Sequence, residues 1–357
     1  MREGRPMAGK AMQDEQTSRR DLLRAGLGVA MVGPVAEALG ATSGQSAGRT
    51  LVLVRLAGGN DGLNTIIPYR DPFYRELRPN LSRAADGAIP LDGRLALHAS
   101  LRPLLPLYEQ GRMTIVPAVG AAEADYSHRG ACRLWANGGR AHPADDTTPS
   151  WWRRAFAERA GRTPRSMWIG WPGRRADGTD SPGVTTLPEH RVLHPMNAGS
   201  LSYRPGMARQ TLRVATQIVL SPQPPDLMFA TMGGFDTHAD QLPSHARILS
   251  ELADGLAAMH ACLAERGAAD RPLVVVWSEF GRRPAENACG GTDHGSAGPV
   301  LLIGGGLPGG LCGSLPSLQD VDPFGTLRPT TSMTSLCAAL ADVWVSQDGS
   351  SHAMRAV

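Results

Sequence analysis

Short apolar runs separated by segments with helical spacing recur along most of the chain. The runs that predict buried strands cover residues 50–56, 113–119, 226–232, 273–277 and 300–303. The clearest predicted helix covers 248–263, where Leu249, Leu252, Leu256 and Leu263 share one face. Shorter helices are predicted for 101–108, 127–134 and 212–219. Buried strands that alternate with amphipathic helices indicate an α/β sheet covered on both faces.

Residues 137–226 interrupt this alternation. They are dense in Pro, Gly, Asp, Arg and Trp and show little periodicity apart from the helix at 212–219. We therefore expect an irregular cap or insertion over the sheet, within a single domain that covers residues 41–357.

Residues 1–40 have the pattern of a signal peptide. The pair Arg19-Arg20 precedes a modestly apolar stretch at 25–35, and small residues follow at 36–41. Paired arginines indicate export by the bacterial twin-arginine machinery, so we expect a periplasmic or otherwise exported protein. The apolar stretch is too short and too rich in Gly and Ala for a stable membrane span. The alternative is an ordinary amphipathic N-terminal helix.

Charge and lysine content exclude several functions. The net charge of +3 is small and evenly spread, which does not favour nucleic acid as a partner. Lys10 is the sole lysine, so the mature chain lacks the lysine that P-loop nucleotide hydrolases and pyridoxal-phosphate enzymes use. Five cysteines in an exported chain leave at least one without a disulfide partner.

Polar residues gather just after the predicted strands. These segments are 58–62, 125–128, 233–240 and 278–282, and a fifth, 291–295, precedes the last strand. Ligands of open α/β sheets bind at the carboxyl ends of the strands. Carboxylates together with imidazoles are ligands that Zn²⁺ or Mn²⁺ accepts, and such ions can hold an anionic ester and activate a nucleophile. The candidate metal ligands in these segments are Asp61, Asp236, His238, Glu279, Asp293 and His294.

The same segments resemble a known family. Arg19-Arg20 and residues 56–64, 234–238, 277–282 and 291–295 are similar to the domain-of-unknown-function family 1501. Its members resemble the alkaline phosphatase and sulfatase superfamily. The resemblance implies a three-layer α/β/α sandwich with a mostly parallel or mixed central sheet, alkaline-phosphatase-like. The chain lacks the Cys/Ser-x-Pro-x-Arg motif needed for formylglycine, which disfavours sulfate-ester hydrolysis by that route.

The resemblance also implies roles for individual residues. Ser127 would be the nucleophile at a helix N-terminus, and Arg282 would grip a phosphate or sulfate oxygen. Asp61 would bind a metal on the nucleophile side. Asp236, His238 and His294 would hold the other metal, although the tight spacing leaves open which of Asp236, His238 and Asp240 binds.

One position departs from the superfamily pattern. Glu279 and Phe280 stand where an Asp-His pair is usual, which removes a nitrogen ligand. The site would then hold one ion or two. Three functions follow: a metal-dependent hydrolase of phosphate or related anionic esters, a non-catalytic metal- or anion-binding protein, and a scaffold for an unidentified exported protein.

Overall fold

The structure is a computed structural model that describes residues 49–140, 149–170, 183–186, 203–304 and 307–345. The predicted signal peptide, residues 1–40, lies outside these ranges. Within them, no helix is both long enough and apolar enough to cross a membrane.

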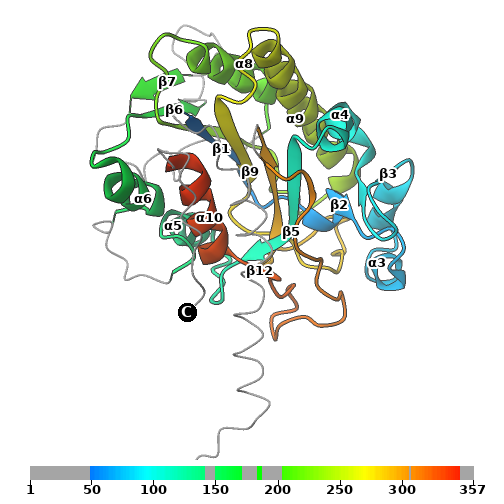
Figure 1. Ribbon diagram of the computed structural model, residues 1–357. Helices are drawn as coiled ribbons and strands as arrows, with labels where there is room; N and C mark the ends of the chain where they lie inside the picture. The colour runs from blue at the N-terminus through cyan, green and yellow to red at the C-terminus, as the bar shows by residue number, and fades with distance from the viewer. Residues whose placement is uncertain (1–48, 141–148, 171–182, 187–202, 305–306, 346–357) are drawn as a thin grey trace, which may run out of the picture.

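A mixed, mostly parallel sheet forms the centre of the described structure (Figure 1). Its strands are β1 (Thr50–Leu56), β5 (Met113–Gly120), β6 (Ser166–Gly170), β7 (Gly183–Thr186), β8 (Leu227–Met232), β9 (Pro272–Trp277), β10 (Gly298–Ile303), β11 (Gly310–Leu311) and β12 (Thr331–Ser332). They lie in the order β11-β5-β10-β9-β1-β8-β6-β7, and β12 also pairs with β5. Strand β1 is parallel to β8 and β9, whereas β10 is antiparallel to β5 and β9. The five strands predicted from apolar runs are thus confirmed.

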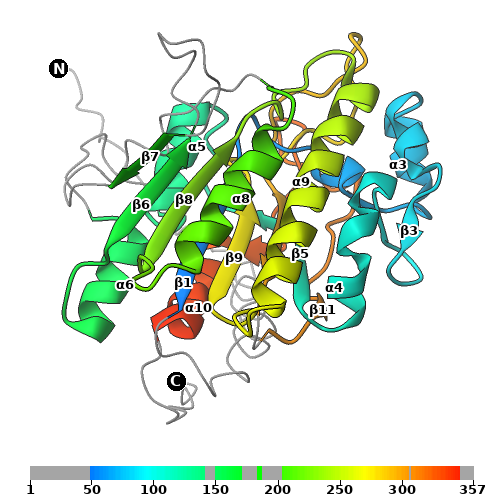
Figure 2. The same cartoon turned by 90° about the horizontal axis from the view of Figure 1, so that it is seen from above.

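Helices cover both faces of this sheet. Successive side chains of a strand point to opposite faces. Val52 and Val54 belong to the core under α8 (Met207–Val219), α9 (Gln241–Ala264), the 3₁₀ helix η3 (Ala99–Leu104) and α4 (Leu105–Glu109). Leu51 and Leu53 belong to the core under α5 (His128–Ala136), α6 (Trp151–Ala160) and α10 (Met333–Val345). Figure 2 shows α8, α9 and α4 on the near side of the sheet, and the predicted three-layer α/β/α sandwich is confirmed.

A small second sheet lies beside the first and was not predicted. It consists of β2 (Ile66–Ile67), β4 (Ala96–Leu97) and β3 (Ile89–Pro90), in that order. Helix α3 (Pro72–Leu77) and the 3₁₀ helices η1 (Gly62–Asn64) and η2 (Leu81–Ala85) accompany it. Two-residue strands are too short to show an alternating pattern, so no periodicity marks them in the sequence.

The structure corrects the prediction of an irregular cap over residues 137–226. In the described parts of this segment, β6 pairs in parallel with β8 inside the central sheet, and α6 and α8 cover opposite faces. Trp152 is buried and its ring packs edge-on against Phe229, 5.2 Å between centroids. Trp151, Trp152 and Phe156 of this segment therefore belong to the core.

The cysteines are mainly small buried residues, as expected. Cys132 and Cys337 are buried thiols, whereas Cys289 is exposed. Burial raises the pKa of the Cys132 thiol to about 12, which keeps it protonated and unreactive at neutral pH.

Candidate metal centre

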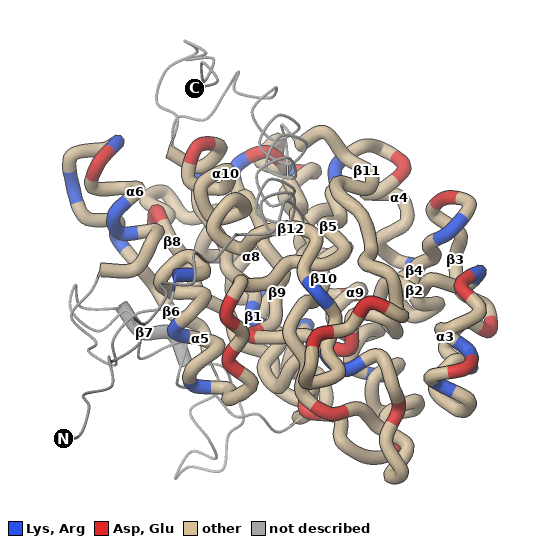
Figure 3. Tube along the Cα trace, turned by 90° about the horizontal axis from the view of Figure 1, so that it is seen from below, with Lys and Arg blue, Asp and Glu red and all other residues tan. Residues whose placement is uncertain are grey.

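The segments chosen for their polar residues meet at one edge of the sheet. Strands β1, β5, β8 and β9 end there, and antiparallel β10 begins there. This edge lies at the top of Figure 2. Acidic positions are prominent along it in the lower half of Figure 3. The segments selected by the strand-end argument therefore lie together in the fold, as that argument predicts.

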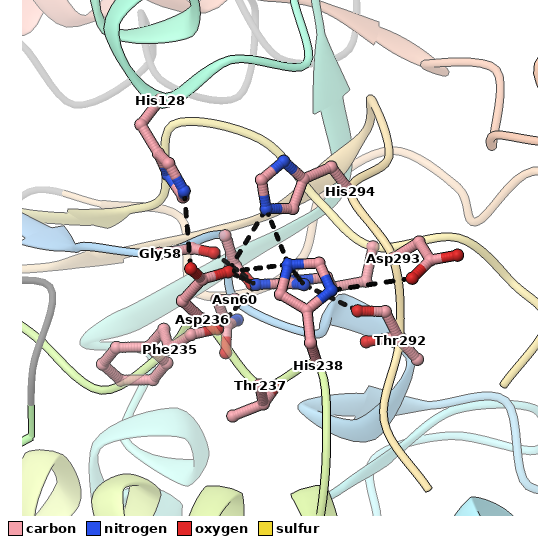
Figure 4. A network of polar contacts seen from close by, with 12 residues as sticks. Gly58, Asn60, His128, Phe235, Asp236, Thr237, His238, Thr292, Asp293 and His294 are labelled. Atoms are coloured by element: carbon pink, nitrogen blue, oxygen red, sulfur yellow. Dashed lines mark hydrogen bonds and ion pairs between the residues drawn. The ribbon is translucent and has the colours of Figure 1, made fainter. Parts of the chain in front are cut away.

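Three histidines surround the carboxylate of Asp236 at this edge (Figure 4). The Nε2 atoms of His238 and His294 lie 3.1 and 3.2 Å from Asp236 Oδ1, and 3.0 Å from each other. The Nε2 atom of His128 lies 3.5 Å from Asp236 Oδ2. All four side chains are partly exposed, between 22% and 46%. The cluster is therefore open to solvent and to a small ligand.

Two of the histidines are oriented by a hydrogen bond at the other ring nitrogen, and the third has a longer contact there. Nδ1 of His294 lies 2.8 Å from the backbone carbonyl oxygen of Tyr126, and Nδ1 of His128 lies 3.0 Å from Glu279 Oε1. Nδ1 of His238 lies 3.6 Å from Asp293 Oδ1. An oxygen acceptor at Nδ1 holds a ring with its Nε2 atom toward Asp236, and a bound ion would take the Nε2 lone pair in place of a proton. Three imidazole Nε2 atoms thus face the Asp236 carboxylate.

The spacing of these atoms fits one divalent ion. Ligand atoms bonded to Zn²⁺ at about 2.0–2.1 Å with tetrahedral angles lie roughly 3.3 Å apart. Asp236 Oδ1 and the Nε2 atoms of His238 and His294 form a triangle with sides of 3.0–3.2 Å. His128, Asp236 and His294 also offer ligand atoms that all lie within 4.8 Å of one another. Nitrogen and carboxylate donors together are typical of Zn²⁺ or Mn²⁺ sites.

The charges around Asp236 keep it ionised. Partial burial opposes ionisation, but hydrogen bonds from His128, His294 and Arg282 hold the pKa of Asp236 well below its usual range. Conversely, the carboxylates of Asp236 and Glu279 raise the pKa of His128 to about 9. A divalent ion would compete with a proton for this imidazole, because both bind the same lone pair.

His128 was not among the predicted ligands. It is the first residue of α5, directly after Ser127, and a histidine at a strand end was the signal that could have identified it. It adds a ring nitrogen to the cluster from the start of α5, the helix after β5. The apolar ring of Phe280 packs beside two of the histidines. The Phe280 ring lies 4.3 Å from the His294 ring and 5.1 Å from the His128 ring, centroid to centroid.

Glu279 and Asp293 contact the histidines rather than the centre of the cluster. The Glu279 side chain is fully buried, and its Oε1 atom accepts a hydrogen bond from the Gly58 N–H at 2.8 Å besides contacting His128. Burial opposes its ionisation, but His128 and Arg55 hold the pKa of Glu279 below its ordinary value. Glu279 and Asp293 thus contact ring nitrogens of His128 and His238, which differs from their predicted role as ligands.

Arg282 is part of the scaffold beneath the site. Its guanidinium is buried and donates to the backbone carbonyls of Gly59, Thr292 and Phe235 at 2.6–3.1 Å, and also to that of Gly58. The remaining contacts are with Asp236 Oδ1 at 2.7 Å and His238 Nε2 at 3.3 Å. These contacts involve all three nitrogens of the guanidinium, which leaves no donor for an ester oxygen. Arg282 was predicted to bind a phosphate or sulfate oxygen, but in the structure it holds the loop carbonyls and Asp236 in position.

Asp61 contacts Arg78 and Gln241 rather than the histidines of the cluster. Arg78 Nη1 lies 2.6 Å from Asp61 Oδ2, which also accepts a hydrogen bond from Gln241. Both members of this ion pair are buried. Burial would raise the pKa of Asp61, but Arg78 and Gln241 hold it below its ordinary value. The position predicted to bind a second metal is thus neutralised by a guanidinium, although Asp61 Oδ1 has no hydrogen-bond partner among the described residues.

Ser127 is the N-cap residue of α5. Its hydroxyl accepts a hydrogen bond from the Gly130 N–H at 3.1 Å and donates to Asp125 Oδ1 at 2.7 Å. Within the described residues, these contacts are local to the helix N-terminus. The structure confirms the predicted start of this helix and places the hydroxyl beside a carboxylate that can accept its proton.

His245 on α9 contacts the first loop of the site, and its burial makes the free energy of unfolding depend on pH. It is fully buried, its Nε2 atom lies 2.9 Å from Asn60 Oδ1, and burial lowers its pKa to about 3. The unfolded imidazole titrates near pH 6.5, so the unfolded state binds more protons between pH 6.5 and 3. This contribution to stability is complete above pH 6.5 and decreases as the pH falls below it.

Urea unfolding measures this effect. Between pH 7.5 and 5, the free energy of unfolding of the wild type should fall by about 2 kcal/mol more than that of a His245→Gln variant. Glutamine retains a donor for Asn60 but does not titrate, and the other histidines contribute equally to both proteins. Equal losses in the two proteins would show that His245 is not buried in its neutral form.

Comparisons with known proteins give one family match. The model "Protein of unknown function (DUF1501)" matches residues 220–324. This segment carries Asp236, His238, Glu279, Arg282 and His294, whereas Asp61 and His128 lie outside it. None of the curated proteins matches the chain.

Several solved structures are similar to the chain at low identity. The Zn complex of the C-terminal periplasmic domain of EcEptC from Escherichia coli has a TM-score of 0.44 and 14% identity, covering 84% of this chain and 83% of the other. The lipoteichoic acid synthase LtaP from Listeria monocytogenes has a TM-score of 0.42 and 8% identity, covering 88% of this chain and 78% of the other. Murine ectonucleotide pyrophosphatase/phosphodiesterase 5 has a TM-score of 0.36 and 13% identity, covering 66% of this chain and 58% of the other.

Proposed function

We propose that this protein binds a divalent ion, Zn²⁺ or Mn²⁺, at Asp236, His238 and His294, with His128 at the side of the site. The observation that carries this proposal is the orientation of the three imidazoles. An oxygen acceptor lies within 3.0 Å of Nδ1 in His128 and His294 and 3.6 Å from Nδ1 in His238, while each Nε2 atom lies within 3.5 Å of an Asp236 oxygen. Such outer contacts are typical of metal-ligating histidines.

We further propose that the site hydrolyses phosphate or related anionic esters. When bound, the ion would supply positive charge to the ester oxygens. Ser127 would be the nucleophile, because its hydroxyl lies at the N-terminus of α5, where the helix dipole favours an anion. Asp125 Oδ1 would take the hydroxyl proton, since it already accepts that hydrogen bond at 2.7 Å. Export by the twin-arginine machinery is proposed from Arg19-Arg20.

Turnover of an aryl phosphate tests the role of Ser127. Ser127→Ala should lower kcat by about a thousandfold or more while metal content stays unchanged. Ser221→Ala, which changes a serine just after the end of α8, is the matched control and should keep the wild-type rate. Because Ser127→Ala also loses a helix cap, thermal unfolding of the variant and the wild type is measured to verify that both are folded at the assay temperature. An unchanged rate in Ser127→Ala would remove Ser127 from the mechanism.

A second candidate function is metal or anion binding without catalysis. It is favoured by the two buried guanidiniums, since Arg78 contacts Asp61 and Arg282 contacts Asp236. These cations partly neutralise the carboxylates from which a two-ion site would be built. Stoichiometric metal with no turnover across a panel of phosphate and related esters would support this candidate over the hydrolase.

A further inference from the structure

Phe324 is the one large hydrophobic side chain that is well exposed in the described part of the chain, at 64%. Its position is nevertheless well defined, because it lies in a tight turn built around Asp322. Asp322 Oδ1 accepts hydrogen bonds from the backbone N–H groups of Phe324 and Thr326 at 2.9 and 2.8 Å. The backbone N–H of Asp322 donates to the Thr326 carbonyl at 2.9 Å, which closes the turn. The exposed ring is therefore presented by an ordered turn.

This turn is attached to the candidate metal centre by two routes. The first is Tyr126, whose hydroxyl donates to Asp322 Oδ2 at 3.0 Å and whose ring lies 5.7 Å from the Phe324 ring. The backbone carbonyl of the same tyrosine accepts the hydrogen bond of His294 Nδ1.

The second route runs through Thr326. Its hydroxyl lies 2.9 Å from the hydroxyl of Ser296, a residue two positions after His294 in the sequence. The backbone carbonyl of Ser296 accepts a hydrogen bond from the Gly281 N–H at 3.0 Å. Phe324 is thus fixed to both segments that flank the cluster. The exposed Phe324 ring packs beside Tyr126, whose backbone contacts a histidine of the cluster, so a ligand that extends from the cluster along Tyr126 would bury apolar surface.

We infer that Phe324 and Tyr126 form an aromatic rim that binds the apolar, planar part of an anionic ester. This inference rests on the proposed function, in which the anionic group lies at Asp236 and the histidines. An aromatic or similarly flat alcohol portion would pack against the two tilted rings, 54° apart, by offset or edge-to-face contact. The substrate class is therefore an aryl-type ester rather than an ester of a small polar alcohol.

Binding of two non-hydrolysable probes to the Zn²⁺-loaded protein tests the inference by calorimetry. Phenylphosphonate carries the ring, and methylphosphonate carries the same anionic group without it. Phe324→Ala should weaken phenylphosphonate binding by about tenfold and leave methylphosphonate unchanged. Phe324→Tyr keeps a ring at this position and should bind both probes as the wild type does.

The outcomes separate this inference from the proposed function. If methylphosphonate binds but Phe324→Ala weakens neither probe, or both equally, the aromatic rim is refuted and the anion site stands. If neither phosphonate binds to the metal-loaded wild type, the ester site is refuted, and the aromatic rim with it.

Discussion

Replacing Arg282 with methionine should lower the free energy of unfolding by about 3–5 kcal/mol, the range expected when one partner of a buried charge network is removed. The guanidinium is the hydrogen-bond donor for the carbonyls of Gly58, Gly59, Phe235 and Thr292. Methionine fills a similar volume but donates nothing, so these carbonyls lose the donor that Arg282 provides. Three loops that carry the site are held by this one side chain.

Two further variants define the origin of that loss. Arg282→Lys keeps the charge but has fewer donors with a different geometry, and should lie between wild type and Arg282→Met. Arg328→Met removes an exposed partner of Asp320 and should cost about 0.5 kcal/mol or less. Urea unfolding in a chelator compares all four proteins with no contribution from a bound ion. If Arg282→Met is no less stable than Arg328→Met, Arg282 does not organise the loops.

Replacing His294 with alanine should weaken Zn²⁺ binding by at least about a hundredfold, because it removes a ligand rather than one of its supporting contacts. Its Nε2 atom lies 3.2 Å from Asp236 and 3.0 Å from His238 Nε2, at the centre of the cluster. Competition with a chromophoric chelator measures the dissociation constant directly.

His260→Ala is the matched control for this variant. His260 lies on α9 away from the cluster, in a cavity lined with Leu256, Met259 and Leu263. This control should bind Zn²⁺ as the wild type does. An unchanged affinity in His294→Ala would show that the ion binds elsewhere, whereas a loss in both variants would indicate a general effect of histidine removal on folding.

The sequence predicts the central sheet well because its strands are buried on both faces. Continuous apolar runs such as 50–56 and 273–277 are too short for core helices and rich in β-branched residues, and the long helix at 248–263 has a clear apolar face. Since parallel strands end at one edge, the same pattern also brings Asp236, His238 and His294 together. Strand β6 was missed because Ser166–Gly170 is short and lies among Gly- and Pro-rich segments that are typical of loops.

The partners of charged residues could not be predicted in the same way. Arg78 lies 17 residues from Asp61 in a segment with no periodic pattern, and nothing local indicates that the two form a buried pair. Arg282 donates mainly to backbone carbonyls, which every residue carries, so no side-chain signal marks its partners. Such contacts depend on the exact course of several loops, which tertiary packing determines.

Metal content tests the central proposal most directly. The mature protein, purified without chelators and analysed by mass spectrometry, should contain close to one Zn²⁺ or Mn²⁺ per chain. A His238→Ala/His294→Ala variant should contain almost none while keeping its circular dichroism spectrum. An absence of metal from the wild type, even after incubation with Zn²⁺ and Mn²⁺, would contradict the proposal and identify the cluster as a hydrogen-bonded network.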